Sequence, residues 1–156
     1  KVGGNYAASL KANSIAHEKG YASEFYLDAK EKKYVDECGA ANFFGIKNNT
    51  YITPKSDSIL PSVTNKSLMQ IAVDLGMKVE RRPVPEEELS TFEEAGACGT
   101  AAVISPVGKI VDHGKEILLP AGMDSMGPIT QKLYDTLTGI QMGRIEAPEG
   151  WIHVIK

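Results

Sequence analysis

Hydrophobic and polar residues follow two different periods along the chain, and these periods predict the order of its helices and strands. Small or apolar residues recur every three to four positions over 5–19, 64–76 and 129–140, which is the spacing of one face of a helix. Gly20 and Gly76 close the first two segments, as glycine commonly does at a helix end. Residues 85–88 (PEEE) place proline and acids where a short helix begins.

Short runs rich in β-branched and aromatic residues predict strands. We expect them over 23–27, 34–38, 42–46, 51–53, 77–84, 100–107, 109–111, 116–119 and 151–155, and we expect the first four to share a sheet. Asn48 and Asn49 tolerate the left-handed backbone of a hairpin turn. Antiparallel hairpins beside helices favour one mixed α/β (mixed α+β) domain with one core, and not a purely parallel sheet.

Composition narrows the class of protein. With 156 residues, 42% hydrophobic and 24% charged, the chain is long enough for one packed domain. Its net charge of −3 is spread along the chain without a basic run, which argues against nucleic acid as a partner. No apolar stretch approaches the roughly 20 residues of a bilayer span, and no signal peptide is evident, so we expect a cytoplasmic protein with no membrane contact.

The two cysteines and the first residue add two further expectations. Cys38 and Cys98 lie outside any CxxC, so neither a disulfide framework nor a thiolate metal site is expected. The first residue is Lys1 and not methionine, so we expect a fragment or a processed product.

Four features could carry chemistry, and each also has a plain structural explanation. Residues 1–6 (KVGGNY) allow close backbone approach to a ligand, or form a flexible terminal hinge. Residues 58–65 (SILPSVTN) lead into a helix start that can bind phosphate, or that Ser62 or Thr64 simply caps. Residues 96–103 (GACGTAAV) form a second phosphate cradle or a structural turn. Glu37 ends a strand, where a solvent-facing acid is common.

Five segments closely resemble the branched-chain-amino-acid aminotransferases in order and spacing. They are 1–10 (KVGGNYAASL), 27–29 (LDA) followed by 37–42 (ECGAAN), 58–64 (SILPSVT), 99–106 (GTAAVISP) and 137–143 (LTGIQMG). The resemblance covers essentially the whole chain. D-amino-acid aminotransferases and aminodeoxychorismate lyases share the lysine and the glutamate, but GGNYAASL and TGIQMG favour the branched-chain group.

The resemblance implies an enzyme of fold type IV that depends on pyridoxal 5'-phosphate (PLP), with two-domain subunits that form homodimers. Residues 1–156 would be most of its C-terminal, cofactor-binding domain, incomplete at the N-terminal edge, with the N-terminal domain absent. The intact enzyme would transfer an amino group between leucine, isoleucine or valine and 2-oxoglutarate. Residues that contact the substrate come largely from the N-terminal domain, so the isolated chain is expected to be inactive. The alternative is a non-catalytic folded fragment.

The resemblance also assigns roles to individual residues. Lys1 would form the Schiff base with PLP, Glu37 would pair with the pyridine nitrogen, and Tyr6 would hydrogen-bond the ring oxygen. Two phosphate cradles are implied: Val63 with Thr64, and Gly99 with Thr100 and Ala101. Lys1, Tyr6, Glu37, Thr64 and Thr100 are expected to converge on one cleft. The chain departs from the family at Ser62, at Asn65 and at Ala97-Cys98, where many members have glycine, arginine and other residues.

Overall fold

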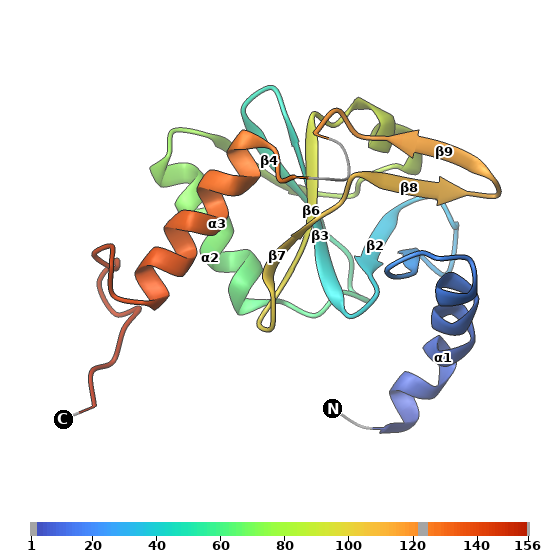
Figure 1. Cartoon of the computed structure of the whole chain (residues 1–156), viewed down its shortest axis with the longest axis horizontal. Coiled ribbons are helices and arrows are strands. Elements are labelled where there is room, and N and C mark those ends of the chain that lie inside the picture. Colours follow the sequence, from blue (N-terminus) through green and yellow to red (C-terminus); the bar gives the residue numbers. More distant parts are fainter. Residues whose placement is uncertain (1–2, 122–124, 156) are drawn as a thin grey trace.

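The computed structural model describes residues 3–121 and 125–155, and Figure 1 shows the arrangement of their elements. The helices are α1 (Gly3–Glu18), α2 (Val63–Asp74), α3 (Pro128–Gln141) and the short 3-10 helix η1 (Glu86–Thr91). The strands are β1 (Phe25–Leu27), β2 (Val35–Cys38), β3 (Ala41–Lys47), β4 (Thr50–Pro54), β5 (Lys78–Arg82), β6 (Glu94–Gly99), β7 (Val103–Pro106), β8 (Lys109–Asp112) and β9 (Lys115–Leu118).

Seven strands form one mixed sheet around β3. The order runs β1-β2-β3-β4-β5, while β6 pairs with β3 and carries β7 on its other side. The β4–β5 pair is parallel and the others are antiparallel, and β8 and β9 form a separate hairpin. The mixed α/β class expected from the sequence is confirmed, and β1 to β4 do lie in one sheet.

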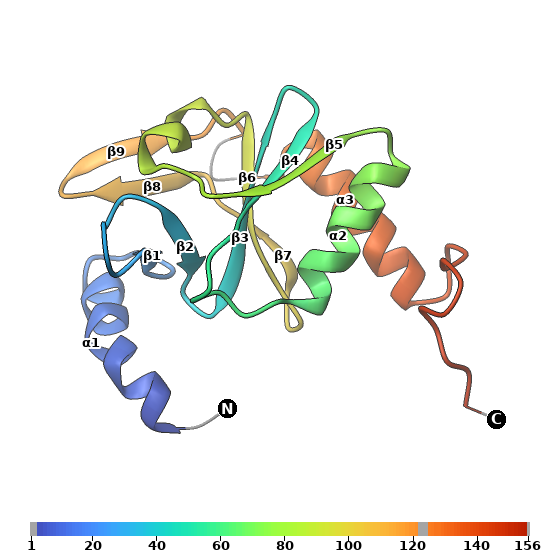
Figure 2. The same cartoon turned by 180° about the vertical axis from the view of Figure 1, so that it is seen from behind.

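The sheet separates two apolar clusters, so the expectation of a single core is wrong. Successive side chains of a strand point to opposite faces, which sends Phe44 to the face covered by α2 and α3 and Phe43 to the other. The first cluster also contains Tyr51, Leu68, Ile71, Leu133 and Leu137. The second contains Ile52, Val84, Leu89, Phe92, Ile110 and Ile117. Figures 1 and 2 show α2 and α3 together on one side of the molecule, with β8 and β9 on the other.

Buried polar side chains join α2 to the sheet. The Tyr51 hydroxyl donates to Asn65 Oδ1 at 2.7 Å, and Asn65 Nδ2 donates to Thr53 Oγ1 at 3.0 Å. Thr53 Oγ1 in turn donates to the Phe43 carbonyl at 2.9 Å. The side chains of Tyr51, Asn65 and Thr53 are all paired in this hydrogen-bond network, so it can be buried without leaving them unpaired. Asn65, one of the departures from the family, therefore has a structural role here.

A carboxylate of the sheet fixes the start of α3. Glu94 in β6 is buried and accepts hydrogen bonds from the backbone N–H groups of Ile129 at 3.0 Å and Thr130 at 2.7 Å. The residue before the helix, Gly127, provides no side-chain cap. Glu94 therefore satisfies helix donors that would otherwise be unpaired, and its negative charge suits the positive end of the helix dipole.

In contrast to α2 and α3, α1 makes little contact with the rest of the chain. Among its described residues only Ala16 is buried, and Tyr6, Leu10 and Ile15 are 45%, 66% and 42% exposed. Gly20 takes the left-handed backbone (φ +77°), as expected where this helix ends. Figures 1 and 2 show α1 projecting from the body of the molecule beside β1 and β2.

Several expected elements are confirmed and two are corrected. The helix expected from Thr64 to Gly76 is α2, and the turn at Asn48 and Asn49 has positive φ at both residues. Thr100 does not begin a strand, because residues 100–102 turn between β6 and β7. Residues 151–155 form no strand, and Ile152, Val154 and Ile155 are exposed.

Candidate cofactor site

Three of the predicted cofactor segments, those with Glu37, with Val63 and Thr64, and with 99–101, come from elements that lie near one edge of the sheet. Asn42 pairs with Glu37 on β2 and with Cys98 on β6, so the end of β2 and the end of β6 flank the start of β3. Two strand spacings correspond to about 10 Å. Figures 1 and 2 both show the β2–β3 turn, the β6–β7 turn and the start of α2 on the same side of the molecule.

Glu37 lies on the face of the sheet that α2 and α3 cover. Asn42, its cross-strand neighbour, donates from Nδ2 to Glu37 Oε1 at 3.4 Å and to the Leu60 carbonyl at 3.2 Å. Leu60 belongs to the loop that leads into α2, so the Glu37 carboxylate is directed toward this loop. The alternative of a strand acid pointing away from α2 into solvent is therefore wrong.

The environment of Glu37 raises the pKa of its carboxyl group. Partial burial raises its pKa, a backbone hydrogen bond from Leu60 acts in the opposite direction, and the charge of Asp36 raises the pKa again. A carboxylate with a raised pKa interacts more strongly with a donor such as a protonated ring nitrogen.

The start of α2 has the geometry of a capped helix end with free N–H groups nearby. Ser62 is the N-cap, with φ −82° and ψ 134°, and its hydroxyl accepts from the backbone N–H of Asn65 at 3.2 Å. This position does not require the left-handed backbone that would favour glycine. Capping by Ser62 is thus confirmed, and it leaves the N–H groups of Val63 and Thr64 at the first turn. The Val63 side chain is exposed and that of Thr64 is buried.

The second expected cradle is the hairpin turn between β6 and β7. Gly99 pairs with Val103, and Thr100, Ala101 and Ala102 between them are exposed. Val103 has φ +61°, a backbone conformation that β-branched residues rarely adopt. A Cβ added at Gly99 would meet nothing within 4 Å, so there is open space beside this turn.

Two predicted residues are not placed beside this edge by any contact. Lys1 lies outside the described residues. Tyr6 lies on α1, where its hydroxyl has no contact described with Glu37 or with either turn. Convergence of Lys1 and Tyr6 with the other residues remains a prediction. Sequence reasoning missed Asn42 and Leu60, although Asn42 is within the ECGAAN segment and its regular position opposite Glu37 follows from the tight β2–β3 turn.

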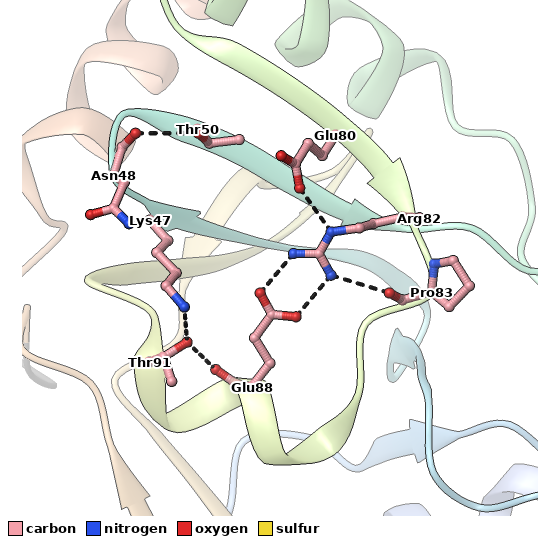
Figure 3. A network of polar contacts seen from close by, with 8 residues as sticks. All are labelled: Lys47, Asn48, Thr50, Glu80, Arg82, Pro83, Glu88 and Thr91. Carbon is pink, nitrogen blue, oxygen red and sulfur yellow. Dashed lines mark hydrogen bonds and ion pairs between the residues drawn. The ribbon is translucent and has the colours of Figure 1, made fainter.

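Two cavities among the described residues lie away from this edge. One, of about 380 Å³, lies between α2, α3 and the C-terminal tail and is lined by apolar residues with Asp74 and Glu146. The other, of about 210 Å³, adjoins the network in Figure 3, where Arg82 binds both oxygens of Glu88 and one oxygen of Glu80. Neither is lined by a predicted cofactor residue.

The structure describes residues 3–121 and 125–155. Within them, no group of three or more histidine, cysteine, aspartate or glutamate side chains is arranged to hold a metal ion. No described helix has the length and apolar character needed to cross a membrane. Cys38 and Cys98 are both free thiols.

Comparison with known proteins identifies the family. The family model described as amino-transferase class IV matches residues 1–110. The chain therefore belongs to the class IV aminotransferases. Among curated relatives, it is 55% identical to the branched-chain-amino-acid aminotransferase of Haemophilus influenzae and 52% identical to that of Helicobacter pylori, over 97% of its own length in both cases. The resemblance stated from the sequence is confirmed.

Solved structures agree with this result. The branched-chain amino acid aminotransferase from Escherichia coli superposes with a TM-score of 0.81 at 32% identity, over 96% of this chain and 48% of the other. The branched-chain amino acid aminotransferase from T.th., solved with pyridoxamine 5'-phosphate, gives a TM-score of 0.82 at 30% identity, over 97% of this chain and 47% of the other. The chain spans about half the length of the curated relatives, 46% and 44% for the two named above.

Proposed function

We propose that this chain is the cofactor-binding part of a PLP-dependent enzyme that transfers amino groups between branched-chain L-amino acids and 2-oxoglutarate. The observation that carries the proposal is the register of β2, β3 and β6 around Asn42, together with the hydrogen bond from Asn42 to the Leu60 carbonyl in the loop before α2. It supports a cofactor site that Glu37, the start of α2 and the 99–101 turn would share. The relatives that share 52–55% of its residues have the name of this activity.

The dimensions and chemistry of this edge fit the cofactor. A PLP ring with its phosphate spans on the order of 8 Å, comparable to the distance of about 10 Å across two strand spacings. Two backbone turns with N–H groups, at Val63 and Thr64 and at 99–101, suit the phosphate, and the raised pKa of Glu37 suits the ring nitrogen. When bound, PLP supplies an electron sink for charge that develops at the substrate Cα.

The residues of this chain would then act as follows. Lys1 would hold the cofactor covalently and carry the proton that leaves and returns at the substrate Cα. Glu37 would keep the ring nitrogen protonated, and Asn42 would orient the Glu37 carboxylate. Tyr6 would donate to the ring oxygen, which requires the N-terminal part of α1 to lie over this edge.

The whole enzyme would need residues beyond this chain. We propose that the remaining half of the relatives' length supplies an N-terminal domain with the substrate-carboxylate contacts, and that the enzyme is a cytoplasmic homodimer. The free thiols of Cys38 and Cys98 are in keeping with a reducing compartment. We expect the 156-residue chain alone to bind PLP weakly and to show no transamination.

The test is a coupled glutamate assay with leucine and 2-oxoglutarate, on the 156-residue chain and on a longer enzyme with a family N-terminal domain placed before Lys1. In the longer enzyme Lys1→Ala should lower kcat by about 10²-fold or more, because it removes the general acid–base group. Lys11→Ala, an exposed lysine on α1, is the matched control and should have no effect. Full activity of Lys1→Ala would contradict the assignment, and turnover with D-amino acids only would favour the D-amino-acid aminotransferases.

A further inference from the structure

One glutamate outside the predicted site, Glu24, links helix α1 to the sheet through hydrogen bonds. Glu24 lies in the link between α1 and β1 and accepts three side-chain hydrogen bonds. Asn13 Nδ2 and the Tyr26 hydroxyl each donate at 3.0 Å, and the Ser23 hydroxyl donates at 3.4 Å. We name these four residues the Glu24 cluster.

The Glu24 cluster joins α1 to the strand that carries Glu37. Asn13 is a residue of α1, whereas the backbone of Glu24 accepts from the N–H of Gly39 at 2.8 Å, two residues after Glu37. A Cβ at Gly39 would lie 2.2 Å from Ser23 Oγ, so the two segments are in close contact at this point. One residue, Glu24, thus connects the helix that follows Lys1 with the strand of the cofactor edge, through its side chain on one side and its backbone carbonyl on the other.

Apart from the Glu24 cluster and a hydrogen bond between Ser9 on α1 and Tyr26 on β1, little else holds α1 in place. Ala16 is its one buried residue among those whose side chains are described, and its apolar residues Tyr6, Leu10 and Ile15 are largely exposed. Apolar packing therefore contributes little to its position, and a charge-assisted hydrogen bond contributes proportionally more.

The charge of Glu24 is retained at neutral pH. Partial burial raises its pKa, but the hydrogen bonds from Asn13, from the backbone and from Tyr26 and Ser23 together outweigh burial, so the pKa lies below its ordinary value. Glu24 is therefore an ionised acceptor, the stronger kind of hydrogen-bond partner, under the conditions in which the enzyme would work.

We propose that Glu24 is a positioning residue: it anchors α1 to the β1–β2 edge and thereby sets where Lys1 reaches relative to Glu37. The positioning of Lys1 rests on the proposed function, whereas the anchoring of α1 does not. Helix α1 begins at Gly3, two residues after Lys1, so its direction limits the positions available to the lysine.

The anchoring is tested by hydrogen exchange of the 156-residue chain. Glu24→Ala should speed exchange of the α1 amides roughly tenfold, the change expected from the loss of one hydrogen bond to a charged group, and should leave β3 and β4 unchanged. Glu24→Gln keeps an acceptor oxygen and should recover much of the protection. Glu18→Ala, at an exposed glutamate of α1, is the control. Equal exchange in Glu24→Ala and Glu18→Ala would overturn the proposal.

The positioning of Lys1 is tested in the longer enzyme by borohydride reduction at limiting PLP, with the modified Lys1 peptide quantified by mass spectrometry. Glu24→Ala should lower the trapped fraction several-fold, Glu24→Gln should restore it in part, and Glu18→Ala should match the unchanged protein. Equal trapping in Glu24→Ala and the unchanged protein would overturn the positioning. No trapping on Lys1 in the unchanged protein would contradict the proposed function, while hydrogen exchange would still decide whether Glu24 anchors α1.

Discussion

At the scale of single residues, Val103 combines a β-branched side chain with a left-handed backbone. Its φ of +61° follows the 100–102 turn, where glycine or asparagine is usual. Such a conformation costs an L-residue roughly 1–2 kcal/mol, and glycine avoids the cost. The structure therefore stores strain two residues after one of the two proposed phosphate cradles.

Because of this strain, we expect a glycine variant at position 103 to be more stable than an alanine variant, which is the reverse of the usual order in a strand. We expect Val103→Gly to be more stable than Val103→Ala by about 1 kcal/mol, because both remove the side chain but only glycine is at ease with positive φ. Val111 in β8 is the control, and there the alanine variant should be more stable than the glycine variant by about 0.5–1 kcal/mol. Urea denaturation gives the four free energies of unfolding. The same order at both positions would show that Val103 is not strained.

Asp28 is a second residue whose backbone contacts have a measurable consequence. Its carboxylate accepts from the N–H groups of Glu31, Lys33 and Tyr34 at 2.6, 2.9 and 2.8 Å. These bonds, that of Tyr34 first, lower its pKa from 3.8 to about 2. A carboxyl whose pKa is lowered by folding stabilises the folded state above its unfolded pKa, and this contribution is lost as the pH falls through the folded pKa.

Asp28→Ala should therefore lower the free energy of unfolding at pH 7, and the difference from the unchanged protein should narrow between pH 3.8 and about 2. Thermal unfolding at a series of pH values measures this difference. Asp57→Ala, at an exposed aspartate of the loop before α2, is the control substitution. A constant difference between the Asp28 variant and the unchanged protein down to pH 2 would rule out ionisation as the cause.

At the scale of elements, the attachment of α3 depends on the contact between Glu94 and the helix start. Glu94→Ala would leave two N–H groups of α3 unpaired, one of them on buried Thr130, and should destabilise the protein by about 2–4 kcal/mol. Glu94→Gln keeps one acceptor oxygen and should cost less. Lys132→Ala, exposed on the same helix, should stay within about 0.5 kcal/mol of the unchanged protein. Chemical denaturation would refute this role if the Glu94 and Lys132 variants were equally stable.

Helix α2 and strand β6 show which elements the sequence predicts and which it does not. Residues with a regular period, such as Leu68, Ile71 and Leu75, indicated α2 correctly, because they face a core that any helix at this place would need. Strand β6 was missed, since its Ala95, Gly96 and Ala97 have low strand propensity. Tertiary packing explains why a small residue is needed here, because a Cβ at Gly96 would lie 2.6 Å from the ring of Phe44.

The candidate site was predicted less completely than the fold. The chemistry of Glu37 and of the two turns could be assigned from a resemblance, but their common edge depends on Asn42, which pairs across the sheet with residues 5 positions before it and 56 positions after it. Such strand pairings cannot be inferred from the spacing of residues along the sequence. The position of Lys1 depends in turn on α1, which the sequence predicts as a helix without indicating how weakly it is attached.

At the scale of the whole molecule, one sheet lies between two apolar clusters that have no residue in common. Adjacent residues of β3 and β4 contribute to opposite clusters, Phe43 and Phe44 on one strand, Tyr51 and Ile52 on the other. A loss of packing in either cluster therefore disturbs β3 and β4, which also contribute residues to the other cluster. The two clusters should unfold together, which is also the behaviour of a single domain.

Two substitutions and two probes test this coupling. Trp151 packs against the first cluster and reports on the α2–α3 face, whereas far-UV circular dichroism reports on the whole chain. Phe92→Ala removes a buried ring from the second cluster and should lower the free energy of unfolding by about 3–5 kcal/mol. Its urea transition should shift to the same lower midpoint by both probes, while Leu118→Ala, exposed on β9, should shift neither. A Trp151 transition that stayed at the original midpoint would mean that the two faces unfold independently.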